Sequence, residues 1–280
     1  MSLLEQVALA GLSFGHALRA SRRLAMWLPW LLVPGTSLLA LAALAWCAHP
    51  LLSSFMAPLL RASAGEEALR YPGLYRLLPQ IVAGVRFVLD ALVVPVAFGG
   101  SALAFAAFYR GQEPDTGALL RETLRRAPVF VLAALPVWLA EAGLRAGVAA
   151  LPGMRLAGLA RVLAPHVADA ALVLVRATFL YAVVHAALVR RGPAAAVASV
   201  PGSLRDGFVP ALLIMAVLGV PLAALDAVAT GPFAAFAGRV PESALLLAGL
   251  RAALAALAGV LASGTATLVW LGALAPREAA

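Results

Sequence analysis

The sequence predicts an all-α, polytopic membrane protein with six membrane-spanning helices. Hydrophobic residues make up 63% of the 280 residues and charged residues only 12%, against about 25% in an average soluble domain. Six apolar runs are long enough to cross a bilayer, for which a helix needs about 20 residues. This composition excludes a disordered chain, a disulfide scaffold and a conventional soluble enzyme.

The six predicted spans cover most of the chain, so we expect residues 1–280 to form a single transmembrane domain. The first apolar run continues from Arg23 to Arg61 without any Asp, Glu, Arg or Lys. It exceeds the roughly 7–15 apolar residues of a signal peptide, so we interpret it as a retained span. The predicted spans are residues 24–48, 81–109, 127–150, 169–189, 208–230 and 245–274.

All 21 basic residues are arginine, and their distribution predicts the orientation of the chain. Eleven lie before the first span, after the second and fourth spans, and after the sixth; seven lie in the other three loops. Cytoplasmic loops of membrane proteins carry such an excess of positive charge. We therefore expect a bacterial inner-membrane protein with both termini in the cytoplasm. The arginines form no aromatic-interleaved face of the kind that binds nucleic acid.

Two predicted outer segments, residues 61–80 and 141–168, are long enough to hold a helix of their own. Each mixes arginines with Leu, Val and Ala. Such a segment can lie in the membrane interface or extend a neighbouring helix. The sequence leaves both alternatives open.

A degenerate threefold repeat divides the chain into units of about residues 12–109, 112–189 and 195–275. Each unit begins with a short, basic, amphipathic segment that we expect in the cytoplasm, followed by a helical hairpin. Periodic self-similarity of this kind indicates stacked supersecondary units. The three leading segments are GHALRASRRLAMWLP (15–29), GALLRETLRRAPVFV (117–131) and VPGSLRDGFVPALLI (200–214).

The segments RGQEPDTGALLRETLRRAPVF (110–130) and RRGPAAAVASVPGSLRDGFVPALL (190–213) carry a family resemblance. They resemble the cytoplasmic loops of a group of bacterial six-helix membrane proteins. That group includes proteins similar to the membrane domain fused to some glycerophosphodiester phosphodiesterases. The resemblance implies an envelope-associated membrane protein, and it brings no catalytic residue to this chain.

Three arginines lie at matching positions inside the second helix of each unit: Arg86, Arg176 and Arg251. An arginine at the centre of a spanning helix costs about 2.5–3.5 kcal/mol, so each position needs an explanation. One interpretation is a set of ion pairs that hold the hairpins together. The acidic partners would be Asp90, Glu141 and Asp226.

The other interpretation is that the three arginines converge on a site for a lipid phosphate or a carboxylated substrate. Guanidinium groups suit this role because their planar fork can bind an anion at two points. Asp90 could also act as a proton carrier, although Arg86 four residues earlier makes neutralisation the simpler role.

Residues 113–126, EPDTGALLRETLRR, are the best candidates for contact with anionic lipid or a cytoplasmic protein. Asp115 or Thr116 is expected to cap a short surface helix there. Leu119, Leu120 and Leu124 would form its apolar face. Its cationic contacts would be Arg121, Arg125 and Arg126.

Motifs of membrane enzymes are missing, because the sequence has neither an HExxH motif nor a GxSxG motif nor a phosphate-binding loop. The spacing of His49 and His166 does not support a metal site. We therefore expect no enzyme activity, metal or cofactor. The predicted function is a scaffold or accessory subunit in envelope or lipid homeostasis.

The alternative is a transporter or permease subunit for an anionic lipid or small molecule, working with a soluble ATPase. Small residues at Ala255, Gly259 and Ser263, and at 99–101, predict close helix–helix contacts. These contacts could lie within one chain or between chains of a homo-oligomer.

Overall fold

The computed structural model describes residues 1–45, 54, 57–58, 61–62, 65–66, 73–150, 158–189, 192–230 and 241–274. Within these residues all regular structure is helical, so the predicted all-α class is confirmed there. Five helices are long and apolar enough to cross a membrane, as expected of a multi-pass protein. They are Phe87–Tyr109, Thr116–Val148, Val167–Leu188, Val200–Leu225 and Gly249–Leu274.

Each of these five spans is part of a longer helix that begins before the predicted span. Residues 73–80, 141–150 and 158–168 therefore extend their neighbouring helices, which decides between the two alternatives for the described parts of the outer segments. The helices are α5 (Gly73–Tyr109), α6 (Thr116–Ala150), α7 (Gly158–Leu188), α9 (Val200–Thr230) and α11 (Pro241–Val269). A π-helical turn, Trp270–Leu274, continues α11.

The first predicted span is interrupted near its start. It consists of a short α2 (Leu24–Trp27), a 3-10 turn (Leu28–Leu31) and α3 (Leu32–Ala45). Pro29, which has no backbone N–H to donate, sits at the beginning of the 3-10 turn. The described apolar part, Leu24–Leu39, is shorter than a full span, and residues 46–48 lie outside the described residues. The sixth crossing therefore stays a prediction.

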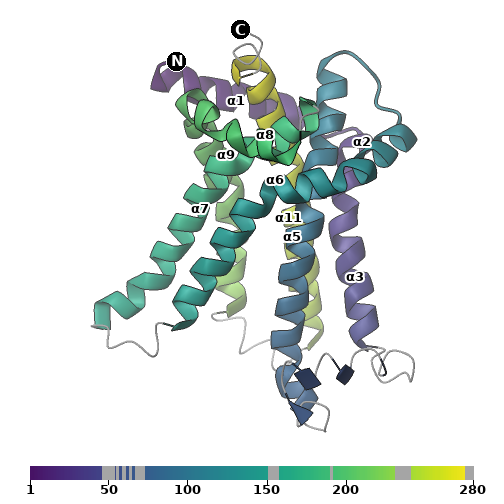
Figure 1. The fold of residues 1–280 in the computed structure, drawn as a ribbon, viewed down its shortest axis with the longest axis vertical. Coiled ribbons are helices and arrows are strands. Elements are labelled where there is room, and N and C mark those ends of the chain that lie inside the picture. Colours follow the sequence, from purple (N-terminus) through teal and green to yellow (C-terminus); the bar gives the residue numbers. More distant parts are fainter. Residues whose placement is uncertain are drawn as a thin grey trace.

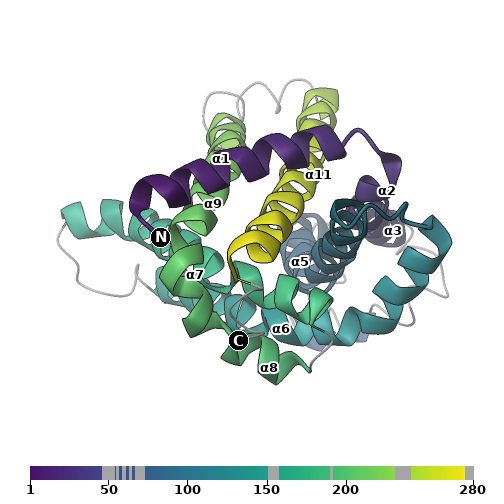
Figure 2. The same ribbon diagram turned by 90° about the horizontal axis from the view of Figure 1, so that it is seen from above.

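A helix not anticipated from the sequence, α1 (Leu3–Ala20), precedes these elements. Ser2 and Glu5 form a capping box at its start: the Ser2 hydroxyl accepts from the Glu5 amide, and the Glu5 carboxylate accepts from the Ser2 amide. α1 lies across one end of the bundle, where it packs on α9 and α11 (Figures 1 and 2). We call this the terminal end, because the N-terminus and the turn Trp270–Leu274 both lie there.

At the opposite end, which we call the far end, α6 finishes and α7 begins, and the helices spread apart (Figure 1). The chain enters α6 at the terminal end through a tight turn. Gly111 there has φ +76°, which glycine adopts without strain, and the Gln112 amide donates to the Ala107 carbonyl at 3.0 Å. The Asp115 side chain then accepts from the Gly117 amide at 3.0 Å, capping α6 as predicted for this segment.

The centre of the bundle is formed by α5 and α11, whose spans are 61% and 56% buried. The outer helices α6 and α9 are each only 17% buried. α6 packs between α5 and α7, while α9 packs between α7 and α11. The view along the bundle shows α1 lying over this arrangement (Figure 2). The second helices of the predicted units, α5, α7 and α11, contact one another, and the span of α7 is 33% buried.

Aromatic side chains packed onto glycines hold the terminal end together. A Cβ on Gly99 of α5 would meet the Phe130 ring of α6 at 2.7 Å, and one on Gly259 of α11 would collide with the Trp30 indole. The Phe105 ring occupies the space over Gly264 in the same way. Small residues let helix backbones approach closely. In lipid this packing drives helix association, because the hydrophobic effect does not act between helices there.

A hydroxyl chain crosses the same region. Ser263 of α11 donates to Ser101 of α5 at 2.8 Å, and Ser101 donates to the Met26 carbonyl at 3.2 Å. All three residues are buried. Gly259 and Ser263, and the segment 99–101, therefore pack within this one chain.

Candidate functional site

The charged cluster with the most specific geometry lies inside the bundle's α6–α7 contact. Glu141 of α6 accepts from Arg176 of α7 at 2.8 Å, through one carboxylate oxygen. Its other oxygen accepts from Arg145, four residues later on α6. Glu141 is 12% exposed, whereas the two guanidinium groups are 62% and 46% exposed for Arg145 and Arg176. One carboxylate thus holds two arginines side by side.

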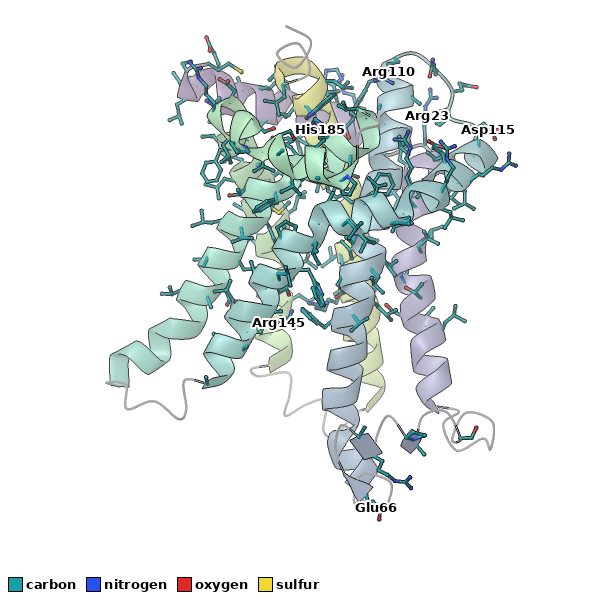
Figure 3. The ribbon with its side chains drawn as sticks, viewed as in Figure 1. Arg23, Glu66, Arg110, Asp115, Arg145 and His185 are labelled. Atoms are coloured by element: carbon teal, nitrogen blue, oxygen red, sulfur yellow. The ribbon has the colours of Figure 1, made fainter. Side chains whose placement is uncertain are left out.

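An aromatic stack supports this cluster from α5. The Arg145 guanidinium lies above the Phe87 ring, 4.8 Å from its centre. The negative face of an aromatic ring attracts a cation at this distance. Phe87 in turn stacks on Trp138 of α6 at 5.5 Å between ring centres. Figure 3 shows Arg145 in the half of the bundle toward the far end. The stack fixes the position of Arg145 relative to α5.

A groove of about 430 Å³ opens beside the cluster between α6 and α7. Its charged lining comes from Glu141, Arg145 and Asp169. Its apolar lining comes from Leu144, Val148, Ala168 and Leu172. The groove is therefore lined by both charged and aliphatic side chains, and α6 and α7 each contribute some of both.

The other residues of the predicted anion site are placed less completely. The side chains of Arg86 and Asp226 lie outside the described residues. Arg251 is half-buried in α11, and Asp90 is exposed on α5. Arg176 is the member of the predicted arginine triplet that pairs with Glu141. Arg145, which sequence reasoning assigned to an outer loop, joins it; the i,i+4 spacing from Glu141 was the available signal.

The three arginines at the start of α6 differ in their surroundings. Arg121 is exposed, and Arg125 is 70% exposed and pairs with Glu122 at 2.9 Å. Arg126 is only 12% exposed: it pairs with Glu122 at 2.6 Å and donates to the Ala187 carbonyl at 2.9 Å. That carbonyl is in the last turn of α7, where a cation complements the helix dipole. Arg126 thus contacts other residues of this chain, whereas Arg121 and Arg125 are exposed and could contact lipid or another protein.

The predicted apolar face of this segment is divided in the same way. Leu119 is 8% exposed and packs into the core, whereas Leu124 is 55% exposed. The segment is also continuous with its span, because α6 runs from Thr116 to Ala150 without a break. It is therefore the first part of a long helix, and this part lies across the bundle before α6 bends into its span (Figure 1). The expectation of a separate short helix at 113–126 is wrong, because the segment continues into the span.

Arg23 ties the first unit to the loop that precedes α6. Its guanidinium lies 4.5 Å from the centre of the Phe108 ring and 3.7 Å from the Glu113 carboxylate. Figure 3 places Arg23, Arg110, Asp115 and His185 at the terminal end. The basic leading segments therefore gather at one end of the bundle.

Buried polar side chains at the terminal end form a group that sequence reasoning did not find. Asp206 of α9 is 2% exposed and pairs with the Met1 amino group at 3.0 Å. Tyr181 of α7 donates to the Gly207 carbonyl at 3.1 Å. His185, one turn after Tyr181, meets the edge of Trp270 at 6.1 Å between ring centres. These residues connect α1, α7, α9 and the turn after α11.

Metal-type ligands do not gather in the described part of the chain: no group of three or more His, Cys, Asp or Glu side chains is placed to hold an ion there. No family model, curated protein or solved structure matches the chain significantly.

Proposed function

We propose that the protein is a non-enzymatic scaffold or accessory subunit of the bacterial inner membrane, acting in envelope or lipid homeostasis. The observation that carries this proposal is the packed centre of the bundle at the terminal end. Phe105, Phe130 and Trp30 fill the space left by glycines on α5 and α11. A centre filled in this way favours a rigid support over a path for a substrate.

The orientation belongs to the same proposal. We place both termini in the cytoplasm, with six crossings arranged as three hairpins around α5, α7 and α11. The N-terminus and the turn Trp270–Leu274 lie at the same end of the bundle, which supports an even number of crossings (Figure 1). The position of the exposed Arg23 and Arg110 at that end (Figure 3) supports its cytoplasmic location.

The exposed arginines at the start of α6 supply the surface for a partner. Arg121 and Arg125 point away from the core, while Arg126 fixes the segment on α7. An anionic headgroup attracts each basic residue near the membrane surface by about 1 kcal/mol. A cytoplasmic protein with an acidic face would use the same two side chains.

Purification from native membranes in lipid-containing nanodiscs, followed by mass spectrometry, tests the proposal. We expect stoichiometric co-purifying protein that is lost in an Arg121→Glu/Arg125→Glu variant of unchanged thermal stability. A chain that purifies alone, in both forms, would contradict the scaffold role. Reporter fusions test the orientation, since a C-terminal fusion outside the cytoplasm would overturn the six-crossing arrangement.

A transport subunit for an anionic lipid or small molecule is the second candidate. The paired guanidinium groups of Arg145 and Arg176 beside an amphipathic groove favour it. Each guanidinium carries five donors, so pairing with Glu141 leaves donors for a phosphate. Alanine at both Arg145 and Arg176 should abolish retention of anionic lipid if they form this site. Unchanged retention would remove the candidate.

A further inference from the structure

The helix α1 has an unusual division of side chains. The face that packs on α9 and α11 is made of small and polar residues, while most of its leucines point away from the bundle. The buried residues are Gln6, Ala10, Ser13, Ala17 and Ala20. The exposed large residues include Leu3, Leu4, Val7 and Leu18, with exposed fractions of 65%, 80%, 43% and 50%.

These exposed side chains form two different flanks. At about 100° per residue, Leu3, Leu4, Val7 and Leu18 fall on one side of the buried stripe. We call them the apolar flank. Glu5, His16 and Arg19 fall on the other side, and all three are exposed; we call them the polar flank. Leu12, 67% exposed, is the one large apolar residue on the polar flank.

The position of α1 places its apolar flank near the start of the first span. The helix lies across the bundle, at the ends of α9 and α11, rather than along them (Figures 1 and 2). The corner that follows is fixed, because the Trp27 indole donates to the Ser21 carbonyl at 2.6 Å. The chain then descends directly into the apolar α2, where Leu24 is 71% exposed. Exposed leucines therefore lie on both sides of this corner, Leu18 on the apolar flank and Leu24 at the start of the first span.

Charge complementarity supports the same occupant. Arg19 and Arg22 are exposed at the end of α1, next to the start of the span. An interfacial helix places apolar residues in the acyl boundary and basic residues among anionic headgroups. We propose that α1 lies in the plane of the membrane interface, with its apolar flank in the acyl region of a leaflet containing anionic lipid.

In this arrangement α1 is a membrane-surface strap held by the ends of two spanning helices. Its burial of small residues brings the helix close to α9 and α11, and the amino group of Met1 pairs with buried Asp206 of α9. Both ends of the strap are thereby attached to the bundle. The proposal does not depend on whether the chain is a scaffold or a transport subunit.

Quenching of single fluorescent labels tests the position of each flank. In a Cys47→Ser background, which removes the single cysteine, the full chain would carry Leu4→Cys, Leu18→Cys or His16→Cys. Each variant is labelled with an environment-sensitive fluorophore in vesicles of phosphatidylcholine and phosphatidylglycerol. We expect brominated phospholipid to quench labels at 4 and 18 several-fold more than the label at 16. Aqueous iodide should show the reverse order.

Two results would overturn the proposal. Equal iodide quenching at positions 4, 16 and 18 would place the apolar flank in water. Shielding of positions 4 and 18 from both quenchers, changing with the protein-to-lipid ratio, would show a second copy of the chain on this flank.

The charged part of the proposal has its own variant. We expect phosphatidylglycerol to move the Leu18→Cys label deeper, seen as a blue shift of its emission. An Arg19→Gln/Arg22→Gln pair should remove this dependence on phosphatidylglycerol without moving the label out of the acyl region. Emission that does not respond to phosphatidylglycerol in the parent chain would contradict the requirement for anionic lipid.

Discussion

At the terminal end, aromatic rings sit directly on glycine backbone, and buried serines of α5 and α11 bond to one another. Toward the far end, the described contact between α6 and α7 includes one carboxylate, Glu141, that pairs with Arg176 across the contact and with Arg145 on its own helix. The first kind of contact depends on close packing, so a larger side chain there lowers the stability of the fold. The second uses charge, which tolerates changes of shape. The terminal end is thus the closely packed half, here called the rigid half, and the far end is the half where the paired guanidinium groups are half-exposed.

Gly259→Leu should break the rigid half with the largest effect. The new side chain would have to displace the Trp30 indole, so we expect a loss of about 3 kcal/mol in the free energy of unfolding. Gly219→Leu in α9 is the matched control, because nothing lies within 4 Å of a Cβ there. Thermal unfolding in detergent measures both variants. Equal stability of the two would contradict the packed terminal end.

Arg126→Ala and Arg125→Ala compare two adjacent arginines with opposite surroundings. Arg126 donates to the last turn of α7 and is nearly buried, so its removal should cost about 1.5–3 kcal/mol. Arg125 is exposed, so its removal should cost about 0–1 kcal/mol. Thermal unfolding of the two variants checks the difference. A larger loss at Arg125 would show that the segment docks on α7 differently.

Glu141→Gln tests the charged contact at the far end. Without the carboxylate, Arg145 and Arg176 lose their shared partner inside an apolar span. We expect a loss of about 1–2 kcal/mol, less than the full cost of unpaired arginines because both side chains are half-exposed and can reach the headgroups. Asp169→Asn in the same groove should change stability little. Unfolding temperatures in nanodiscs compare the two variants. An unchanged unfolding temperature of Glu141→Gln would show that the ion pairs of Glu141 do not stabilise the contact between α6 and α7.

Ser263→Ala should give the smallest effect, although it lies in the rigid half. Hydrogen bonds between spanning helices contribute about 0.6 kcal/mol in membrane proteins. A double-mutant cycle with Ser101→Ala isolates the bond between the two hydroxyls. A coupling energy well above that value would show that the serines, rather than the rings on glycine, hold α5 to α11.

The helical class and most spans could be predicted because long apolar runs leave little choice in a bilayer, where every backbone group must bond internally. The sequence leaves the starts of α5 and α7 open, because the segments 61–80 and 141–168 could equally lie in the membrane interface or extend a neighbouring helix. A helix can continue beyond the hydrocarbon region, so composition marks the span and not the helix. α1 was missed although Ser2 and Glu5 carry the capping-box spacing.

Candidate site residues were harder to predict, because pairing depends on how helices face one another. The proximity of Glu141 to Arg176 followed from their depth in adjacent helices, and the structure places them 2.8 Å apart. The role of Arg126 did not follow, since only the tertiary contact with α7 distinguishes it from Arg125. The buried pair of Asp206 and the Met1 amine joins residues 205 positions apart, which no local spacing reveals.

Water accessibility along α5 and α11 tests the central claim most directly. Single cysteines at Ala97 and Val260, in the packed core, and at Leu92 and Leu257, nearer the bilayer, would be challenged with a membrane-impermeant thiol reagent in intact vesicles. A solid core predicts no reaction at Ala97 and Val260, which are fully buried. Labelling of Ala97 and Val260, and not of Leu92 and Leu257, would reveal an aqueous path through the bundle and would contradict the scaffold account.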